Sequence, residues 1–439
     1  MILIITFVVL FTMIILGVPI PTAFGAAVIV LTLFNGAFDD TMWMYPTAYG
    51  RSVTILLMTI PMFVLAGSIM NKGKLGTVLV EWLEFLFGKL RGNLIFVASF
   101  ACGIFGAVSG SGTATLSCIG SIVSPRMIQA KYPLGVVGAV LCCSAPLGLL
   151  IPPSGIQILV AWSGNLSVLG CFLSTAVPGV ILMILIGIVG WLMVRKSPDI
   201  PPAVKMPPKE WAPTLGKRTA NAIPALLMPV IILGGIYGGF MTPTESAAVA
   251  VLYALPVAAI IYRSLTLRDF ISSVHEAAVT TGVIMIMVIF VSILSRLLLM
   301  ADLPGIILGI LLSISDNKYV ILIMINLMMI IIGMVMDDTS GTLLCVPILL
   351  PIMVELGFSP YHFAAILGVN LGMGNVTPPC APFLYMSSRV CGANTSSMLK
   401  PVLLLLLFAY LPTLILTTYV PDVALWLPHA IMGDKLVMF

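Results

Sequence analysis

Hydroxyl and glycine residues crowd into one stretch of an otherwise apolar segment, SGSGTATLS at residues 109–117. Ser109 and Ser111 offer neutral oxygen atoms there, and the glycines disfavour regular helix. A second polar stretch, GMVMDDTSG at 333–341, adds the carboxylate of Asp337, which suits a hard cation. Polar groups inside apolar sequence need partners. The two stretches therefore predict binding sites for small cations.

Each half of the chain also carries a glycine followed by a pair of prolines. Gly148 precedes IPPSG at 151–155, and Gly374 precedes TPPCA at 377–381. A proline pair prevents regular helix and frees carbonyl oxygens upstream, and such oxygens can replace the hydration shell of a small cation. The new helix N-termini favour anions. We therefore expect two cation sites with an anion site between them.

The two halves share this pattern at one offset. A shift of 226 residues (374 − 148) places Gly148 on Gly374 and Ser111 on Asp337, with the proline pairs in register. Glycine and proline have strong backbone consequences, so their joint spacing predicts a divergent internal repeat. Secondary transporters commonly have inverted repeats with interrupted helices at corresponding positions.

The interruptions predict two kinds of element in each half, a re-entrant hairpin and a broken helix. The apolar arms beside each polar stretch are marginal for a full crossing of about 20 residues, and a non-helical tip must be buried in protein or face water. The expected hairpin arms are 92–108 with 116–130 and 318–335 with 342–356. The expected interruptions are 106–115 and 333–341 for the hairpins, and 144–155 and 370–381 for the broken helices.

The composition indicates an all-α polytopic membrane protein. Of 439 residues, 60% are hydrophobic and 8% charged, whereas soluble domains carry about 25% charged residues. Apolar runs of about 20 residues recur along the chain, as membrane helices require, and we interpret the first run, 1–19, as a membrane helix. The net charge of +4 comes from loop residues and does not suggest a nucleic-acid partner.

One charged stretch divides the chain. Residues 195–221 contain eight charged residues, six of them basic, with several prolines. This pattern predicts a cytoplasmic loop by the positive-inside rule. It separates a first half, 1–194, from a second half, 222–439, and we expect scaffold helices together with one hairpin repeat in each.

Other interpretations of single residues stay open. Asp337 and Asp338 could lie at a membrane edge, although intramembrane carboxylates are usually functional. Glu245 fits a helix capping box in TPTES and is assigned no transport role. Arg389 could meet an anion, or its head could extend to the membrane surface. An intramembrane enzyme using Ser109 or the aspartate pair is a rival, but no histidine accompanies Ser109 in sequence, so we expect a transporter and no enzyme.

The chain resembles the large membrane subunit (DctM type) of tripartite ATP-independent periplasmic (TRAP) transporters over nearly its whole length. The resemblance is carried by IPMFVLAG (60–67), GAVSGSGTATLSCIGSIVSPRM (106–127), GLLIPPS (148–154), GGIYGGFMTPTESAAVAVLYAL (234–255), GMVMDD (333–338) and NLGMGNVTPPCAPF (370–383).

The resemblance implies an elevator-type, sodium-coupled importer of small organic anions, usually carboxylates and sometimes sulfonates, in the bacterial inner membrane. Its partners would be a smaller four-helix membrane subunit and a periplasmic binding protein that delivers the substrate, with no organic cofactor. The first half would carry the inner hairpin and the second half the outer one. A stand-alone sodium-coupled anion transporter of related architecture is the nearest alternative, and a passive channel is a third option.

The resemblance also implies site residues. Two sodium sites would use Ser109, Gly148, Ile151 and Pro153 in the first half, largely through backbone oxygens, and Asp337, Gly374, Thr377 and Pro379 in the second. Substrate would contact Ser109, Gly110, Ser111 and Thr339.

One position departs from the family pattern. The family commonly has an aspartate six residues after the first serine of the hairpin motif, and here that position is Thr115. Either carbonyl and hydroxyl oxygens alone hold the first sodium, or that site is weaker. The identity of the anion, the sodium stoichiometry and the oligomeric state stay open at this stage.

Overall fold

The computed structural model describes residues 2–35, 38–88, 90–200, 208–378 and 380–433, and within these ranges it is helical, without a strand. Eight of the described helices are long and apolar enough to cross a membrane, and the bent pair Leu134–Leu150 with Gly155–Gly164 makes a ninth if it is one span. The predicted all-α polytopic membrane class is confirmed.

The elements follow one another along the chain in this order: α1 Ile2–Ile15, α2 Ile20–Asn35, α3 Phe38–Ser52, η1 Ile55–Met58, α4 Thr59–Lys72, α5 Leu75–Phe87, α6 Leu94–Ser109, α7 Gly112–Gln129, α8 Leu134–Ser144, α9 Leu147–Leu150, α10 Gly155–Gly164, α11 Val168–Val194, α12 Pro208–Tyr237, α13 Pro243–Pro256, η2 Val257–Ile261, α14 Leu267–Met300, α15 Leu303–Ile314, α16 Lys318–Val335, α17 Asp338–Glu355, α18 Pro360–Val376, α19 Pro382–Cys391, α20 Thr395–Leu405, η3 Leu406–Tyr410, α21 Leu411–Tyr419 and α22 Pro421–Met432.

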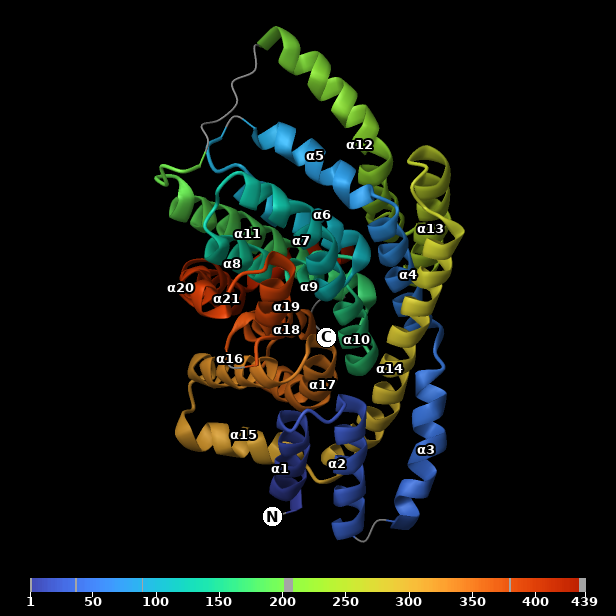
Figure 1. Ribbon diagram of the computed structural model, residues 1–439. Coiled ribbons are helices and arrows are strands. Elements are labelled where there is room, and N and C mark those ends of the chain that lie inside the picture. Colours follow the sequence, from blue (N-terminus) through green and yellow to red (C-terminus); the bar gives the residue numbers. More distant parts are fainter. Residues whose placement is uncertain (1, 36–37, 89, 201–207, 379, 434–439) are drawn as a thin grey trace.

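A column of helices runs along one side of the molecule, and the interrupted elements gather beside it (Figure 1). The column contains α3, α4, α13 and α14, of which α14 is the longest at 34 residues and contacts α2, α3 and α4. Beside the column lie α6 to α11 from the first half and α16 to α21 from the second. Helix α13 begins with the predicted capping box, in which the side chains of Thr242 and Glu245 each accept a hydrogen bond from the other residue's backbone N–H.

The first apolar run, 1–19, was expected to form a membrane helix, and the helix found there is shorter than the run. Helix α1 has 14 residues and ends at Ile15, so it is shorter than a crossing of about 20 residues needs. Gly17 adopts a left-handed φ of +80°, and Pro19 follows before α2 begins. Glycine in this conformation and proline both end a helix.

The charged stretch 195–221 was expected to be loop throughout, and its second part is helix instead. Helix α12 begins at Pro208 and runs to Tyr237. Proline is tolerated in the first turn of a helix, and contacts hold α12 against its neighbours further along, at Thr219 and Asn221. Trp82 Nε1 donates to Thr219 Oγ1 at 3.1 Å, and Tyr262 OH donates to the Asn221 carbonyl at 2.7 Å.

Closely connected helix pairs occupy both predicted hairpin positions, and the helix after each pair is interrupted, while their re-entrant character stays a prediction. The interruption at 144–155 has the predicted bounds, since α8 ends at Ser144 and α10 begins at Gly155 around the short α9, but the other interruptions are shorter than the sequence predicted. Only Gly110 and Ser111 separate α6 from α7, and only Met336 and Asp337 separate α16 from α17. Helix α18 likewise continues to Val376 before its break. Most of the hydroxyl residues are therefore helical, because one left-handed or extended residue is enough to turn a chain whose next helix is capped.

The helix boundaries of the two halves follow the predicted spacing. Helix α17 begins 226 residues after α7 (338 − 112), and α18 begins 226 residues after α8 (360 − 134). Ser111 and Asp337, which the offset pairs, both occupy the N-cap position of the helix that follows. The two N-caps perform the same local task with different side chains, a hydroxyl and a carboxylate.

Candidate functional site

The tip of the first hairpin depends on a glycine. Helix α6 ends at Ser109, and Gly110 has a left-handed φ of +60°, a conformation that costs other residues free energy. Ser111 is extended and caps α7, accepting from the Ala114 N–H at 3.4 Å. The turn is therefore tight, and it brings two hydroxyls to the tip.

Thr115 joins these hydroxyls from the first turn of α7. Its Oγ1 donates to the Ser111 carbonyl at 2.7 Å and lies 3.1 Å from Ser109 Oγ. Since the Thr115 proton goes to the carbonyl, the Ser109 hydroxyl donates either to Thr115 Oγ1 or to the Ser111 carbonyl, which lies 3.4 Å away. The lone pairs of the Ser109 oxygen then remain available to a cation. Thr115 is fully buried and does not line the cavity, so it stabilises the tip from the protein interior.

The first broken helix packs directly against this tip. An added Cβ on Gly148 would lie 2.8 Å from Thr115 Oγ1 and 2.9 Å from the Ser111 carbonyl, and one on Gly106 would lie 2.5 Å from Gly148 Cα. The Gly155 N–H donates to the Gly110 carbonyl at 3.1 Å. The two elements therefore meet backbone to backbone, which glycine alone permits.

The bend in this helix frees a carbonyl oxygen. The segments α8–α9 and α10 are bent by 44° at the break. Pro152 stands where an N–H would bond to the Gly148 carbonyl, and Pro153 stands in the same relation to Leu149. The Ser154 hydroxyl donates a hydrogen bond to the Leu149 carbonyl at 2.7 Å. The Gly148 carbonyl is thus one of the oxygens that the break leaves without a partner in its own helix.

The residues predicted for the first cation site gather at this break. An added Cβ on Gly110 would lie 3.3 Å from the Pro153 carbonyl, and one on Gly148 would meet the Ser111 carbonyl beside Ser109. Ile151 ends α9 within the same break, and its side chain packs towards Gly103 on α6. Its backbone oxygen is therefore the group that it can offer, as the prediction requires.

The second tip carries the carboxylate. Asp337 caps α17 and accepts from the Thr339 N–H at 3.2 Å and from the Ser340 hydroxyl. Ser340 is buried, and its part in holding Asp337 was not recognised in the sequence. The signal that could have revealed it is the three-residue spacing of an N-cap and its partner.

The second broken helix meets this tip as the first one meets its own. An added Cβ on Gly374 would lie 2.7 Å from the backbone of Gly333. In the amide orientation that satisfies both bonds, Asn375 donates to the Gly333 and Met336 carbonyls at 3.1 and 3.0 Å. Asn375 was missed in the sequence, because nothing local shows that its amide reaches another helix.

The other residues predicted for the second cation site lie at the break itself. The Thr377 N–H donates to the Gly374 carbonyl at 3.0 Å, and its hydroxyl donates to the Met373 carbonyl at 2.6 Å. The lone pairs of the Thr377 hydroxyl remain free to accept. Pro379 lies outside the described residues.

A single cavity of about 510 Å³ connects both tips. The residues predicted to contact substrate, Ser109, Gly110, Ser111 and Thr339, all line it. Its remaining walls come from α2, α4, α10 and α14 and are mostly apolar. They consist of Pro19, Ile20, Pro21, Ile60, Phe63, Val64, Gly155, Ile156, Leu159, Val279, Thr280, Val283, Ile284 and Met287, while Thr113, Asp337, Asp338 and Ser340 complete the tips.

The charged residues that line the cavity are all acidic among those that the structure describes. Asp337 and Asp338 line it, and none of the described lining residues is basic. Helices α2, α7, α10 and α17 all begin at the cavity, and helix N-termini carry partial positive charge. Arg389 is exposed and is absent from the lining. An anion in this cavity would therefore meet hydroxyls and helix N-termini beside carboxylates that need a cation.

Sequence comparisons place this architecture among known transport proteins. A family described as "Tripartite ATP-independent periplasmic transporter, DctM component" matches residues 7–423. The isethionate TRAP transporter permease protein DctMQ of Oleidesulfovibrio alaskensis is 31% identical over 94% of this chain, which spans 64% of that relative's length. The C4-dicarboxylate TRAP transporter large permease protein DctM of Pseudomonas aeruginosa is 32% identical, with 91% of this chain and 92% of the relative covered.

A third relative and two solved structures extend the comparison. The sialic acid TRAP transporter large permease protein SiaM of Vibrio cholerae is 33% identical, with 86% of this chain and 87% of the relative covered. The YdaH transporter of Alcanivorax borkumensis has a TM-score of 0.62 at 14% identity, covering 88% of this chain and 90% of that one. MtrF of Neisseria gonorrhoeae has a TM-score of 0.60 at 14% identity, covering 89% and 86%. These two structures share the fold.

Proposed function

The chain belongs to the DctM family of tripartite ATP-independent periplasmic transporter components, and from this premise we propose that it is the large membrane subunit of a sodium-coupled importer of a small organic anion. The observation that carries the proposal is the single cavity to which both hairpin tips contribute their polar groups. The relatives act on dicarboxylates, sialic acid and isethionate by name. A carboxylate or sulfonate is therefore the substrate class that we assign to this chain.

Two sodium ions would bind where each tip meets its broken helix. The first would use the Ser109 hydroxyl and the Gly148 carbonyl, with the backbone oxygens of Ile151 and Pro153. The second would use the Asp337 carboxylate with Gly374, Thr377 and Pro379. Oxygen ligands of this kind suit a hard cation. Thr115 supports the first site through Ser109 and supplies no charge to it.

Sodium coupling follows from the charges of the cavity. An anion near Asp337 and Asp338 is repelled, by about 4 kcal/mol for unit charges 4 Å apart at an effective dielectric constant of 20. A bound sodium cancels this repulsion, so the anion gains affinity only after the cation has bound. By reciprocity the anion then raises the affinity for sodium by the same factor. Hydroxyls and the N-termini of α7, α10 and α17 would hold the anion.

Transport would proceed by an elevator movement. The two hairpins and broken helices would form the moving group, related as inverted repeats within 1–194 and 222–439, and α4 and α14 would belong to the scaffold. A small four-helix subunit would brace the scaffold in the bacterial inner membrane, and a periplasmic protein would deliver the anion. The equal spacing of the helix boundaries supports the repeat, and the printed names of the relatives support the tripartite assembly.

A stand-alone transporter is the second candidate, because the structural neighbours YdaH and MtrF share the fold. The two candidates differ in one requirement. A tripartite transporter needs its binding protein, whereas a stand-alone transporter takes up free substrate. Uptake into vesicles with and without the binding protein distinguishes them.

The test of sodium coupling is uptake by the reconstituted complex under a sodium gradient. Asp337→Asn keeps the size of the side chain and removes its charge, so we expect the sodium concentration for half-maximal uptake to rise at least tenfold. Asp316→Asn changes an exposed aspartate between α15 and α16 and serves as the matched control. Unchanged sodium dependence in Asp337→Asn would remove this carboxylate from the site.

A further inference from the structure

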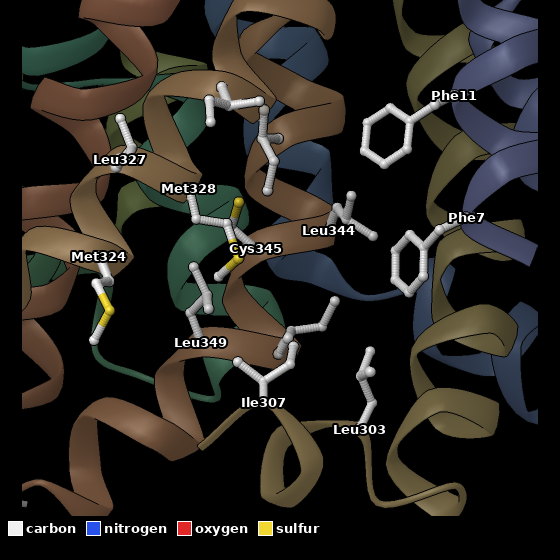
Figure 2. A pocket seen from close by; sticks show the side chains of 13 residues that line it. Phe7, Phe11, Leu303, Ile307, Met324, Leu327, Met328, Leu344, Cys345 and Leu349 are labelled. Atoms are coloured by element: carbon white, nitrogen blue, oxygen red, sulfur yellow. The ribbon is translucent and has the colours of Figure 1, made fainter. Parts of the chain in front are cut away.

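A second large cavity lies away from the cavity that connects the tips. It has a volume of about 510 Å³ and lies among α1, α15, α16 and α17. Figure 2 shows Phe7 and Phe11 on one side of it and Met324 and Leu327 on the other. Leu344 of α17 lies between them. The cavity is thus bounded on one side by the second hairpin, whose tip carries Asp337.

The lining of this second cavity consists of hydrocarbon and sulfur side chains. The remaining residues that line it are Leu303, Ile307, Met328, Ile331, Ile332, Cys345, Ile348 and Leu349. A water molecule needs two or more polar partners, and apolar cavities of this kind stay dry. Ordinary ligand sites add a few placed polar groups to an apolar wall, and this lining has none. Only a hydrocarbon occupant fits such a chemistry.

The cavity opens to the outside of the helix bundle. Leu327 and Ile331 line it and are 57% and 52% exposed, whereas Leu344 and Cys345 form its closed end at 2% and 1%. Both exposed residues lie on α16, which is long and apolar enough to cross a membrane. The mouth therefore faces the hydrocarbon of the bilayer.

The depth of the mouth points to the tail of a lipid. Helix α16 begins at Lys318, whose ammonium lies 5.5 Å from the Tyr319 ring and 5.6 Å from the Phe358 ring. A lysine with aromatic neighbours is typical of the membrane surface. Leu327 and Ile331 follow Lys318 by 9 and 13 residues (327 − 318 and 331 − 318), which places them about 14 and 20 Å along the helix. The mouth thus lies more than two turns along α16 from its surface end, on the apolar part of the helix, where acyl chains are its neighbours.

We propose that this cavity binds one acyl chain of a bilayer phospholipid, inserted sideways between Leu327 and Ile331 and seated against Phe7, Phe11 and Leu344. The volume is more than three times that of the ~150 Å³ cavity that accepts benzene. Filling it restores the dispersion contacts that an empty space of this size forfeits. The headgroup stays at the membrane surface and makes no contact with the cavity. The site is independent of the proposed substrate and of sodium.

The test uses a phospholipid that carries a photoactivatable diazirine on its acyl chain. The full chain is reconstituted into vesicles of phosphatidylethanolamine and phosphatidylglycerol containing this probe, irradiated and mapped by peptide mass spectrometry. We expect adducts on 324–332 and 7–11 at several times the level on Leu403 and Leu407, which are also exposed but lie outside the cavity. Probes with either headgroup should give the same pattern.

A substitution at the mouth supplies the matched comparison. Ile331→Trp should fill the entrance and lower the adducts at 7–11 several-fold, and Leu327→Phe is the smaller alternative should the tryptophan impair folding. Ile323→Trp alters an equally exposed position of α16 outside the lining and should leave the adducts unchanged. Adducts spread evenly over exposed residues would overturn the proposal. So would labelling by a photoactivatable fatty acid but not by the phospholipid, or an unchanged pattern in folded Ile331→Trp and Leu327→Phe.

Discussion

At the scale of single residues, Thr115 determines how the first cation site is built. It is fully buried, and its hydroxyl proton is committed to the Ser111 carbonyl at 2.7 Å. Ser109 then donates to Thr115 or to the Ser111 carbonyl, and in either case its own oxygen is free to accept. A neutral residue at this position thus orients another oxygen, whereas a carboxylate there would bring its own charge. Asp337 retains that charge in the second half.

The contribution of the Thr115 hydroxyl to sodium binding can be measured. Thr115→Val keeps the shape of the side chain and removes both hydrogen bonds, each worth about 1 kcal/mol. Only the contact with Ser109 bears directly on the sodium site, so we expect the sodium concentration for half-maximal uptake to rise roughly fivefold, the factor that corresponds to about 1 kcal/mol. Thr115→Ser keeps the hydroxyl and should stay within about twofold of the unchanged protein. Equal sodium dependence in the two variants would contradict the role given to this hydroxyl.

Residues with strong local consequences were predictable from the sequence, and residues that act across space were not. The offset paired Ser111 with Asp337, and both are N-caps, because capping is a local property. Asn375 reaches the backbone of the hairpin in its own half, and no spacing in the sequence contains that contact. Ser340 could have been found from its distance of three residues to Asp337.

At the scale of elements, glycine pairs determine how closely each hairpin approaches its broken helix. Gly106 meets Gly148 in the first half, and Gly333 meets Gly374 in the second. A side chain at any of these positions would press on backbone atoms, which cannot rotate away. The carbonyl oxygens assigned to the cations lie at these same contacts. Close packing and ion binding therefore both require glycine, which has no Cβ atom, at these positions.

Gly374→Ala tests this dependence. Its Cβ would lie 2.7 Å from the Gly333 backbone, so α18 and α16 must separate. We expect loss of the sodium-dependent rise in unfolding temperature, which measures binding to the folded state, together with a lower unfolding temperature without sodium. Gly309→Ala on α15 meets nothing within 4 Å and should be neutral or slightly stabilising. A normal sodium response in Gly374→Ala would show that the close contact is not needed for the site.

The type of each long element was predictable, but several boundaries were not. Apolar length and proline pairs indicated the hairpins and the broken helices. The helix over 208–221 was missed because charges and prolines resemble a loop, while bonds to Trp82 and Tyr262 from other elements support it. At α1 the sequence indicated too much helix. The apolar run continues through Gly17 and Pro19, but the helix ends before them.

At the scale of the whole molecule, the tips face the helix column across the cavity. Helices α4 and α14 form the apolar wall, and the polar groups come from the tips. An apolar wall makes few directional bonds, so a group of helices can move along it without breaking hydrogen bonds. Gly67 on α4 is an exception to this loose contact, because there the column touches the backbone of the first tip. An added Cβ there would lie 2.9 Å from Ser109 Cα.

Gly67→Ala therefore separates movement from binding. The methyl group would press on the backbone of the tip and favour arrangements in which the tip has moved away from α4. We expect sodium-dependent uptake to fall at least tenfold, while the complex still shows a sodium-dependent rise in unfolding temperature, because the oxygens assigned to sodium lie between the tip and its own broken helix. Gly282→Ala on α14, which meets nothing within 4 Å, is the matched control and should transport normally. Normal uptake by Gly67→Ala would mean that this contact does not change during transport. Loss of both uptake and the sodium response would instead make Gly67 a support of the site itself.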